Sequence, residues 1–444
     1  MKRLAFILAI STLWSCQPEK DTSVIISGVI TDAVSETASV IYQDRSNTYT
    51  DSLDSNSTFE ISFNIDIPTY VNFKHGREST AMYVNPGDRI QLSINTSEFD
   101  ETISYQGSDA SNYLAKKYLL EELVDFRELY SAEETEFLSL VDETESKMYQ
   151  LLDSVNDQDF KNIEKQGILL QWASTKLNYK KYYEYLGNGE LQLSVGYFGF
   201  MNAIDVNDPT FLEDENAYGF LKTYVNANTS DEFEHSLLSN FDFINSTFSN
   251  QSTKDKLSYD LLKEYLKNET LNNIEILFEG YKSVQADTLK FNELKDLAVE
   301  MSVYNEGKPA LDFKYPNTRG DSISLSDFKG SLVYVDVWAT WCGPCKREIP
   351  HLLELEAAYH NENIVFLSVS VDEEKDYDTW LAMLEEKEMG GVQLFASGWS
   401  KITKDYKING IPRFMLFDSN GDIVNVRAPR PSNPAIRPLI DQYL

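Results

Sequence analysis

The sequence predicts a multidomain protein with a small all-β, sandwich-like domain, an all-α middle domain and a C-terminal α/β domain. The chain has 444 residues, 42% of them hydrophobic and 13% aromatic, which is enough for two or three packed domains. Its hydrophobic pattern changes from the two-residue period of strands to the period of helices near residue 108, and to alternating strands and helices near residue 306. In this last part, two cysteines with two residues between them follow a strand pattern.

The N-terminus is expected to be a targeting segment outside the fold. Lys2-Arg3 precedes an apolar run from Leu4 to Trp14 that is too short to span a bilayer, as in a secretion signal. Residues 13–16 resemble a bacterial lipobox, which implies lipidation of Cys16 at the start of the mature protein. Ordinary cleavage that leaves a free thiol is the alternative. We therefore expect a signal peptide over 1–15, a tether over 16–23 and a lipid anchor in the cell envelope or periplasm.

Charge and cysteine content restrict the function. The formal net charge is -32, from 71 acidic and 39 basic residues, so the surface repels phosphate backbones and anionic headgroups. Neither nucleic acid nor electrostatic membrane binding is expected.

With Cys16 assigned to the lipid, Cys342 and Cys345 are the two remaining cysteines. An exported protein with one pair has no disulfide framework, so this pair is expected to be catalytic.

The first two domains are predicted from periodicity. Over 24–107, short strand-like runs alternate, as in Phe59, Ile61, Phe63 and Ile65. Over 108–305, amphipathic runs with three-to-four spacing predict five to seven helices. Tyrosines such as Tyr179 and Tyr183 are candidates for a ligand groove, but packing in the helical core is the preferred interpretation.

The predicted C-terminal domain, 306–444, alternates strands and helices and ends in an antiparallel hairpin, which describes a sheet covered on both faces. A buried strand over 332–338 is followed by a helix from 345. The other expected strands are 310–313, 322–325, 364–371, 392–395, 413–417 and 423–426, and the other helices are 377–387, 400–407 and a last one after Pro434.

The two cysteines predict a redox dithiol. Zinc needs about four ligands, whereas the chain has four histidines and none is suitably spaced from the pair. Cys342 precedes a helix whose first turn contains Pro344, a residue that fits there because it lacks an N–H. The free N–H groups and dipole of that helix end favour a thiolate at Cys342, so we expect Cys342 to attack disulfides and Cys345 to resolve the mixed disulfide. No cofactor besides this redox-active disulfide is expected.

Two carboxylates are candidates for the base that deprotonates Cys345. Asp336 lies in an otherwise apolar strand, where burial is expected to raise its pKa towards neutrality. Glu348 is three residues after Cys345 on the same helix face, and a surface carboxylate is an equally good interpretation of it.

The segment 335–345, VDVWATWCGPC, resembles the active-site strand and helix of thioredoxins, and the stretch from Gly307 onwards resembles the TlpA/ResA-like thiol-disulfide oxidoreductases of bacterial envelopes. This resemblance implies a thioredoxin-like fold for the last domain. It also implies that Asp336 matches the buried thioredoxin aspartate and Glu348 the glutamate of the ResA-like branch. The segment 83–94 resembles a β domain found before such domains in Bacteroidota lipoproteins.

The resemblance also implies a substrate surface. Ile411 and Pro412 occupy the place of the family's cis-proline loop, which faces the dithiol and exposes the Ile411 backbone to a client peptide. Trp341, Gly343 and Pro344 complete this surface, and the Gly-Pro pair matches reducing thioredoxins.

These observations predict an envelope reductant or isomerase of protein disulfides. Its implied partners are protein disulfide clients, with apocytochrome c and misoxidised proteins as candidates, and an inner-membrane thiol electron donor. The alternative is an envelope binding lipoprotein whose β and helical domains carry the function, with an accessory thioredoxin-like domain.

Overall fold

The structure is a computed structural model that describes residues 21–43, 45–229, 233–268, 274–284 and 287–444. Its contacts divide the chain into two compact units, Met1–Ala227 and Asn228–Leu444. The predicted signal peptide and Cys16 lie outside the described residues. In the part of the chain that is described, no helix combines the length and apolar character needed to cross a bilayer. The domain boundaries at 107 and 305 stay a prediction.

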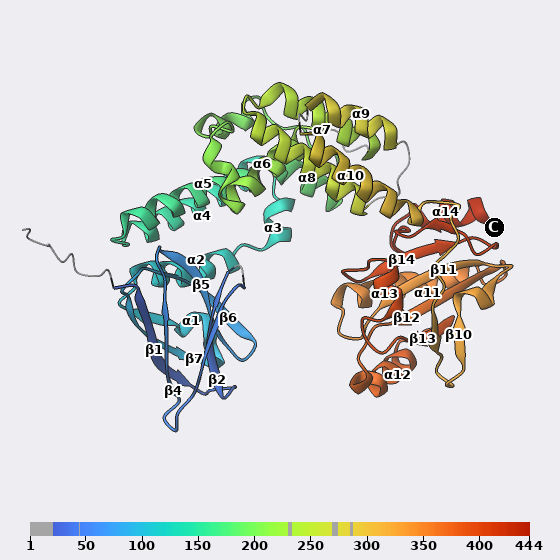
Figure 1. Cartoon of the computed structure of the whole chain (residues 1–444), viewed down its shortest axis with the longest axis horizontal. Helices are drawn as coiled ribbons and strands as arrows, with labels where there is room; N and C mark the ends of the chain where they lie inside the picture. The colour runs from blue at the N-terminus through green and yellow to red at the C-terminus, as the bar shows by residue number, and fades with distance from the viewer. Residues whose placement is uncertain (1–20, 44, 230–232, 269–273, 285–286) are drawn as a thin grey trace, which may run out of the picture. The chain divides into compact units, whose positions relative to one another are not determined.

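The first unit begins with the predicted β-sandwich (Figure 1). Two four-stranded sheets have the strand orders β4-β1-β7-β8 and β3-β2-β5-β6. The alternating apolar side chains of β4 and β7 are buried in one core between them, which confirms the two-residue pattern. The bounds are β1 Ser23–Thr31, β2 Thr37–Tyr42, β3 Thr48–Ser52, β4 Thr58–Asn64, β5 Thr69–His75, β6 Glu78–Val84, β7 Arg89–Asn95, α1 Phe99–Thr102 and β8 Ser104–Gln106.

Five further helices complete the first unit: α2 Asp109–Glu122, α3 Phe126–Ser131, α4 Glu134–Asp153, α5 Gln158–Tyr185 and α6 Glu215–Ala227. Residues of α2, α3, α4 and α5 share an apolar cluster with Tyr83 of β6. A buried ion pair joins Lys117 to Glu164 at 2.9 Å, and the Tyr70 hydroxyl of β5 donates to the same carboxylate at 2.8 Å. The sandwich and these helices therefore pack as one body.

The tyrosines of α5 have mostly structural roles. Tyr179 is fully buried, and its hydroxyl donates to the carbonyl of Ala132 at 2.7 Å. Tyr183 is also buried, within 3.2 Å of a Glu133 carboxylate oxygen. Burial with satisfied hydroxyl groups is what core packing requires, so the packing interpretation holds for both.

The second unit begins with the helices α7 Phe233–Thr247, α8 Gln251–Asn268, α9 Ile274–Val284 and α10 Thr288–Met301. From α2 to α10 the described residues contain nine α-helices, so the prediction of five to seven was too low. One reason is local: Asp125 accepts a hydrogen bond from the Glu128 backbone N–H at 2.7 Å and so starts α3 as a separate short helix after α2.

The C-terminal domain has the predicted α/β architecture. Its five-stranded sheet has the order β13-β12-β11-β14-β15, with β11, β12 and β13 parallel and β14 and β15 antiparallel (Figure 1). The strand β11 is the predicted 332–338, and all seven of its residues are buried. The bounds are β9 Lys314–Pro316, β10 Ser322–Ser324, β11 Leu332–Trp338, α11 Gly343–Ala358, β12 Ile364–Ser370, α12 Tyr377–Glu386, β13 Val392–Phe395, α13 Lys401–Asp405, β14 Arg413–Phe417, β15 Ile423–Asn425 and α14 Ile436–Tyr443.

This topology brings four segments to one sheet edge. The parallel strands β11, β12 and β13 end there, and the antiparallel β14 begins there. The residues beyond these ends are Thr340 to Cys345, Asp372, Trp399 and Pro412. The predicted chemistry therefore lies where open α/β sheets bind their ligands.

Candidate redox site

The two cysteines form a disulfide at the N-terminus of α11. Cys342 is the N-cap residue, and its Sγ accepts a hydrogen bond from the Cys345 backbone N–H at 3.1 Å. The bond joins Cys342 to Cys345, with 5.2 Å between their Cα atoms, and both residues are buried. Pro344 lies in the first turn of α11, as expected. This helix end can stabilise negative charge on the Cys342 sulfur.

Asp336 is buried in the centre of the sheet. It pairs in register with Ser368 of β12 and Phe414 of β14, and its Oδ1 has no hydrogen-bond partner in the described part of the chain. Burial, followed by the charges of Glu348 and Glu356, raises its pKa to about 8. A carboxyl group of this kind is mostly protonated at neutral pH and is suited to proton transfer.

Glu348 is also buried, with 8% of its surface exposed, so the interpretation as a surface carboxylate was wrong. Its oxygens accept from the backbone N–H of Ser432 at 3.0 Å and from the Ser432 hydroxyl at 2.9 Å. The Arg430 guanidinium lies 4.0 Å away. The loop after β15 therefore covers Glu348 and holds it in place, while the charge of Glu348 acts on Asp336.

Asp372 is a site residue that the sequence reasoning missed. It is fully buried after β12, and its carboxylate accepts from the Thr340 N–H at 3.0 and 3.1 Å and from the Thr340 hydroxyl at 2.7 Å. The Ser370 hydroxyl donates to it at 2.7 Å. Asp372 therefore positions the segment two residues before Cys342. The sequence does contain a signal that could have identified Asp372: an acidic residue directly after an apolar strand that runs parallel to β11.

The predicted substrate surface gathers at the same edge. The Ile411–Pro412 peptide bond is cis, as the resemblance implies, and both residues are partly exposed. Trp341, next to Cys342, is 56% exposed, and Trp399 after β13 is 42% exposed. Trp399 was not predicted. Exposed tryptophans at a site are typical of protein contact surfaces.

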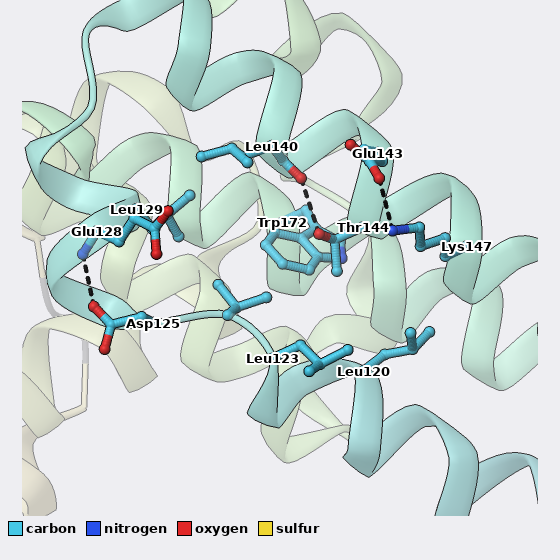
Figure 2. Close-up of a pocket in the computed structure, with 11 residues that line it drawn as sticks. Leu120, Leu123, Asp125, Glu128, Leu129, Leu140, Glu143, Thr144, Lys147 and Trp172 are labelled. Atoms are coloured by element: carbon cyan, nitrogen blue, oxygen red, sulfur yellow. Dashed lines mark hydrogen bonds and ion pairs between the residues drawn. The ribbon is translucent and has the colours of Figure 1, made fainter.

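A separate hollow of about 180 Å³ lies in the helical part of the first unit, with Trp172 among its lining residues (Figure 2). Its polar groups are engaged locally: Lys147 with Glu143 at 2.7 Å, and the Thr144 hydroxyl with the Leu140 carbonyl at 2.9 Å. It is smaller than most small-molecule sites. Within the described residues, no group of three or more His, Cys, Asp or Glu side chains is placed to hold a metal ion.

The comparisons with known proteins agree with this geometry. Residues 307–426 match the model of the AhpC/TSA family. The thiol-disulfide oxidoreductase ResA of Geobacillus kaustophilus is 30% identical over 122 residues, which are 27% of this chain and 67% of that protein. The ResA of Bacillus subtilis is 28% identical over 124 residues, covering 28% and 66%. The chain thus spans about two thirds of the length of these relatives.

Solved structures of Bacteroides vulgatus proteins are also similar. One assigned as a thiol-disulfide oxidoreductase is 39% identical, covers 32% of this chain and 99% of its own, and has a TM-score of 0.30. The thioredoxin domain of another thiol-disulfide oxidoreductase is 27% identical, covers 31% and 96%, and has a TM-score of 0.27. Through its C-terminal domain, the chain belongs to the ResA-like thiol-disulfide oxidoreductases of the AhpC/TSA family, within the thioredoxin superfamily.

Proposed function

We propose that this thiol-disulfide oxidoreductase reduces or isomerises protein disulfides in the cell envelope through Cys342 and Cys345. The observation that carries the proposal is the disulfide at the N-terminus of α11, the helix that follows the strand β11 with its buried Asp336. The basic and apolar N-terminal segment supports export, and the lipobox-like residues ending at Cys16 support a lipid anchor.

In the proposed reaction, the Cys342 thiolate attacks one sulfur of a client disulfide. A bond forms between Cys342 and the client, and the other client sulfur leaves as a thiol after taking up a proton. Cys345 then loses its proton and attacks the Cys342 sulfur, which releases the second client thiol. Two electrons pass from the dithiol to the client, and the Cys342–Cys345 disulfide remains.

Asp336 and Glu348 divide the proton work in this proposal. Asp336 has an oxygen without a partner among the described residues and a pKa near neutrality, so its ionised form, the minority at neutral pH, takes the proton of Cys345. Cys345 and Glu348 are three residues apart on one face of α11. Because the charge of Glu348 acts on Asp336, we place all three side chains between α11 and the sheet. Because Glu348 is held by Ser432, we assign it an electrostatic role that keeps the pKa of Asp336 high.

The donor and clients follow from the chemistry of the compartment. A reductant in an oxidising envelope must be reduced again after each turnover, so an inner-membrane thiol donor is required. Apocytochrome c and misoxidised proteins are the proposed clients. The alternative is that the β and helical domains carry the function and the thioredoxin-like domain is accessory. The relatives described above match the C-terminal third alone, so they lend this alternative no support.

Reduction of insulin in the presence of dithiothreitol tests the proposed function. The purified protein is expected to shorten the time before the insulin B chain precipitates and to increase the rate of precipitation in proportion to its concentration. The same protein with its thiols blocked by iodoacetamide is the control. A rate equal to that of dithiothreitol alone would rule out reduction of protein disulfides.

A further inference from the structure

Arg413, the first residue of β14, directly follows Pro412 at the edge that carries the dithiol. Its guanidinium is partly buried and has no acceptor within hydrogen-bond distance in the part of the chain that the structure describes. Burial, followed by the charge of Arg427, lowers the pKa of Arg413 to about 10. A partly desolvated cation beside a second cation is unfavourable by itself, so Arg413 lowers the stability of the folded protein when no anion is bound to it.

One cation, Arg427, acts on Arg413, and further basic residues follow the neighbouring strand ends and the start of α11. Arg427 and Arg430 follow β15, the neighbour of β14, and Lys346 and Arg347 are exposed in the first turns of α11. Arg427 donates to the carbonyl of Lys267 at 2.9 Å. These five residues, the basic rim, belong to a chain with 71 acidic and 39 basic residues. Arg430 lies 4.0 Å from Glu348, and the charge of Lys346 acts on Glu386, so the pair Arg413 and Arg427 is the part of the rim that favours an anionic partner.

The opposite side of the site has the opposite charge. Glu373, Glu374 and Asp376 follow β12, which lies across β11 from β14. Some of their charge is already neutralised, because Lys375 contacts Glu373 at 2.8 Å. A client segment that crosses the Cys342 region therefore meets acidic groups towards β12 and basic groups towards β14.

We propose that Arg413 binds an aspartate or glutamate side chain next to the reactive cysteine of the client, so that the enzyme prefers disulfides with acidic neighbours. This inference rests on the proposed function. A client strand that pairs with the Ile411 backbone passes Pro412 and brings its next side chains to Arg413. A guanidinium and a carboxylate form a bidentate, charge-assisted pair, and partial burial strengthens it.

The test uses three peptides, each with one cysteine bound to mercaptoethanol in a mixed disulfide. Glu, Gln or Lys flanks that cysteine. Each rate constant with the reduced protein is divided by the rate constant of the same peptide with dithiothreitol, which removes differences in intrinsic reactivity. At low salt, the Glu peptide is expected to react about tenfold faster than the Lys peptide, and this ratio should fall towards one at high salt.

Arg413→Gln should bring the ratio close to one by slowing the Glu peptide. Arg413→Lys keeps the charge but loses the bidentate geometry, so an intermediate ratio is expected. Arg319→Gln is the matched control, because Arg319 is exposed in the β9–β10 turn and contacts Asp321 at 3.3 Å; it should keep the wild-type ratio. Since Arg413→Gln removes a cation without an acceptor, its melting temperature should equal or exceed that of the wild type.

The outcomes separate the two proposals. Equal normalised rates for the three peptides with the wild-type protein would overturn the role of Arg413 and leave the oxidoreductase function intact. A preference that persists in Arg413→Gln would also overturn it. If the wild-type protein reacts with none of the peptides, the proposed function itself fails.

Discussion

Replacement of Cys342 by serine is expected to lower the rate of insulin reduction at least about 10³-fold, to the rate of the uncatalysed reaction. A serine hydroxyl remains protonated at neutral pH and cannot form the mixed disulfide. The helix N-terminus that stabilises a thiolate does not compensate for this, because the sulfur itself is the reacting atom. Cys345 lies within the first turn of α11 and has the resolving role in the proposed reaction, so it is not expected to replace Cys342 as the attacking group.

The control for this prediction is Cys345→Ala. That variant keeps the Cys342 nucleophile, so it should complete the first attack on insulin in a single turnover and then stop as a mixed disulfide. Denaturant unfolding of the reduced proteins should show similar stability for both variants and the wild type. If Cys342→Ser retained more than about a tenth of the wild-type rate, Cys342 would not be the nucleophile.

Replacement of Asp336 by asparagine is expected to stabilise the folded protein at high pH. The pKa of Asp336 is about 8 in the folded state, against an ordinary value of 3.8. Between these two values the folded state holds a proton that the unfolded chain has lost, so stability falls as the pH rises, and the full penalty is present above pH 8. Asparagine does not ionise and avoids the penalty.

The free energy of unfolding of Asp336→Asn, measured in urea, should therefore be close to that of the wild type at pH 4. At pH 8 it should be higher than the wild-type value by a difference on the order of 5 kcal/mol. The same variant should slow the second step of the reaction about tenfold or more, because Cys345 loses its proton acceptor. Val335→Ala is the comparison variant: it removes apolar atoms from the same buried strand and no titratable group or donor to a carboxylate, so it should lower stability by a similar amount at both pH values. A pH-independent effect of Asp336→Asn would show that the carboxyl group is already ionised in the folded protein.

Most strands of the C-terminal domain could be predicted closely because their signals are local, but the strand expected over 310–313 was wrong: the structure has β9 at Lys314–Pro316 instead. The run over 332–338 is apolar at nearly every position, as expected of a central parallel strand, and the structure has the same bounds. The alternation in β4 and β7 placed the core of the sandwich correctly. The helices were harder, since α3 has six residues and its start depends on one capping side chain.

The chemistry around the dithiol could be predicted only in part. Cys342, Cys345 and Asp336 stand in one segment with a recognisable pattern. The burial of Glu348 depends on Ser432, which is 84 residues away in the sequence. Asp372 contacts Thr340, which is 32 residues away in the sequence. Arg413 stands out because it has no counterion among the described residues, which only the structure can show. Contacts of this kind arise from the sheet order, which periodicity does not provide.

The equilibrium reduction potential of the Cys342–Cys345 pair tests the central claim most directly. The protein is equilibrated with buffers of reduced and oxidised dithiothreitol or glutathione, and the fraction of free thiol is measured after acid quenching. A pair that acts as a reductant or isomerase should have a potential between about -270 mV, as in thioredoxin, and about -180 mV, as in protein disulfide isomerase. A value above about -150 mV would approach that of strong oxidants and would contradict the proposed direction of electron flow.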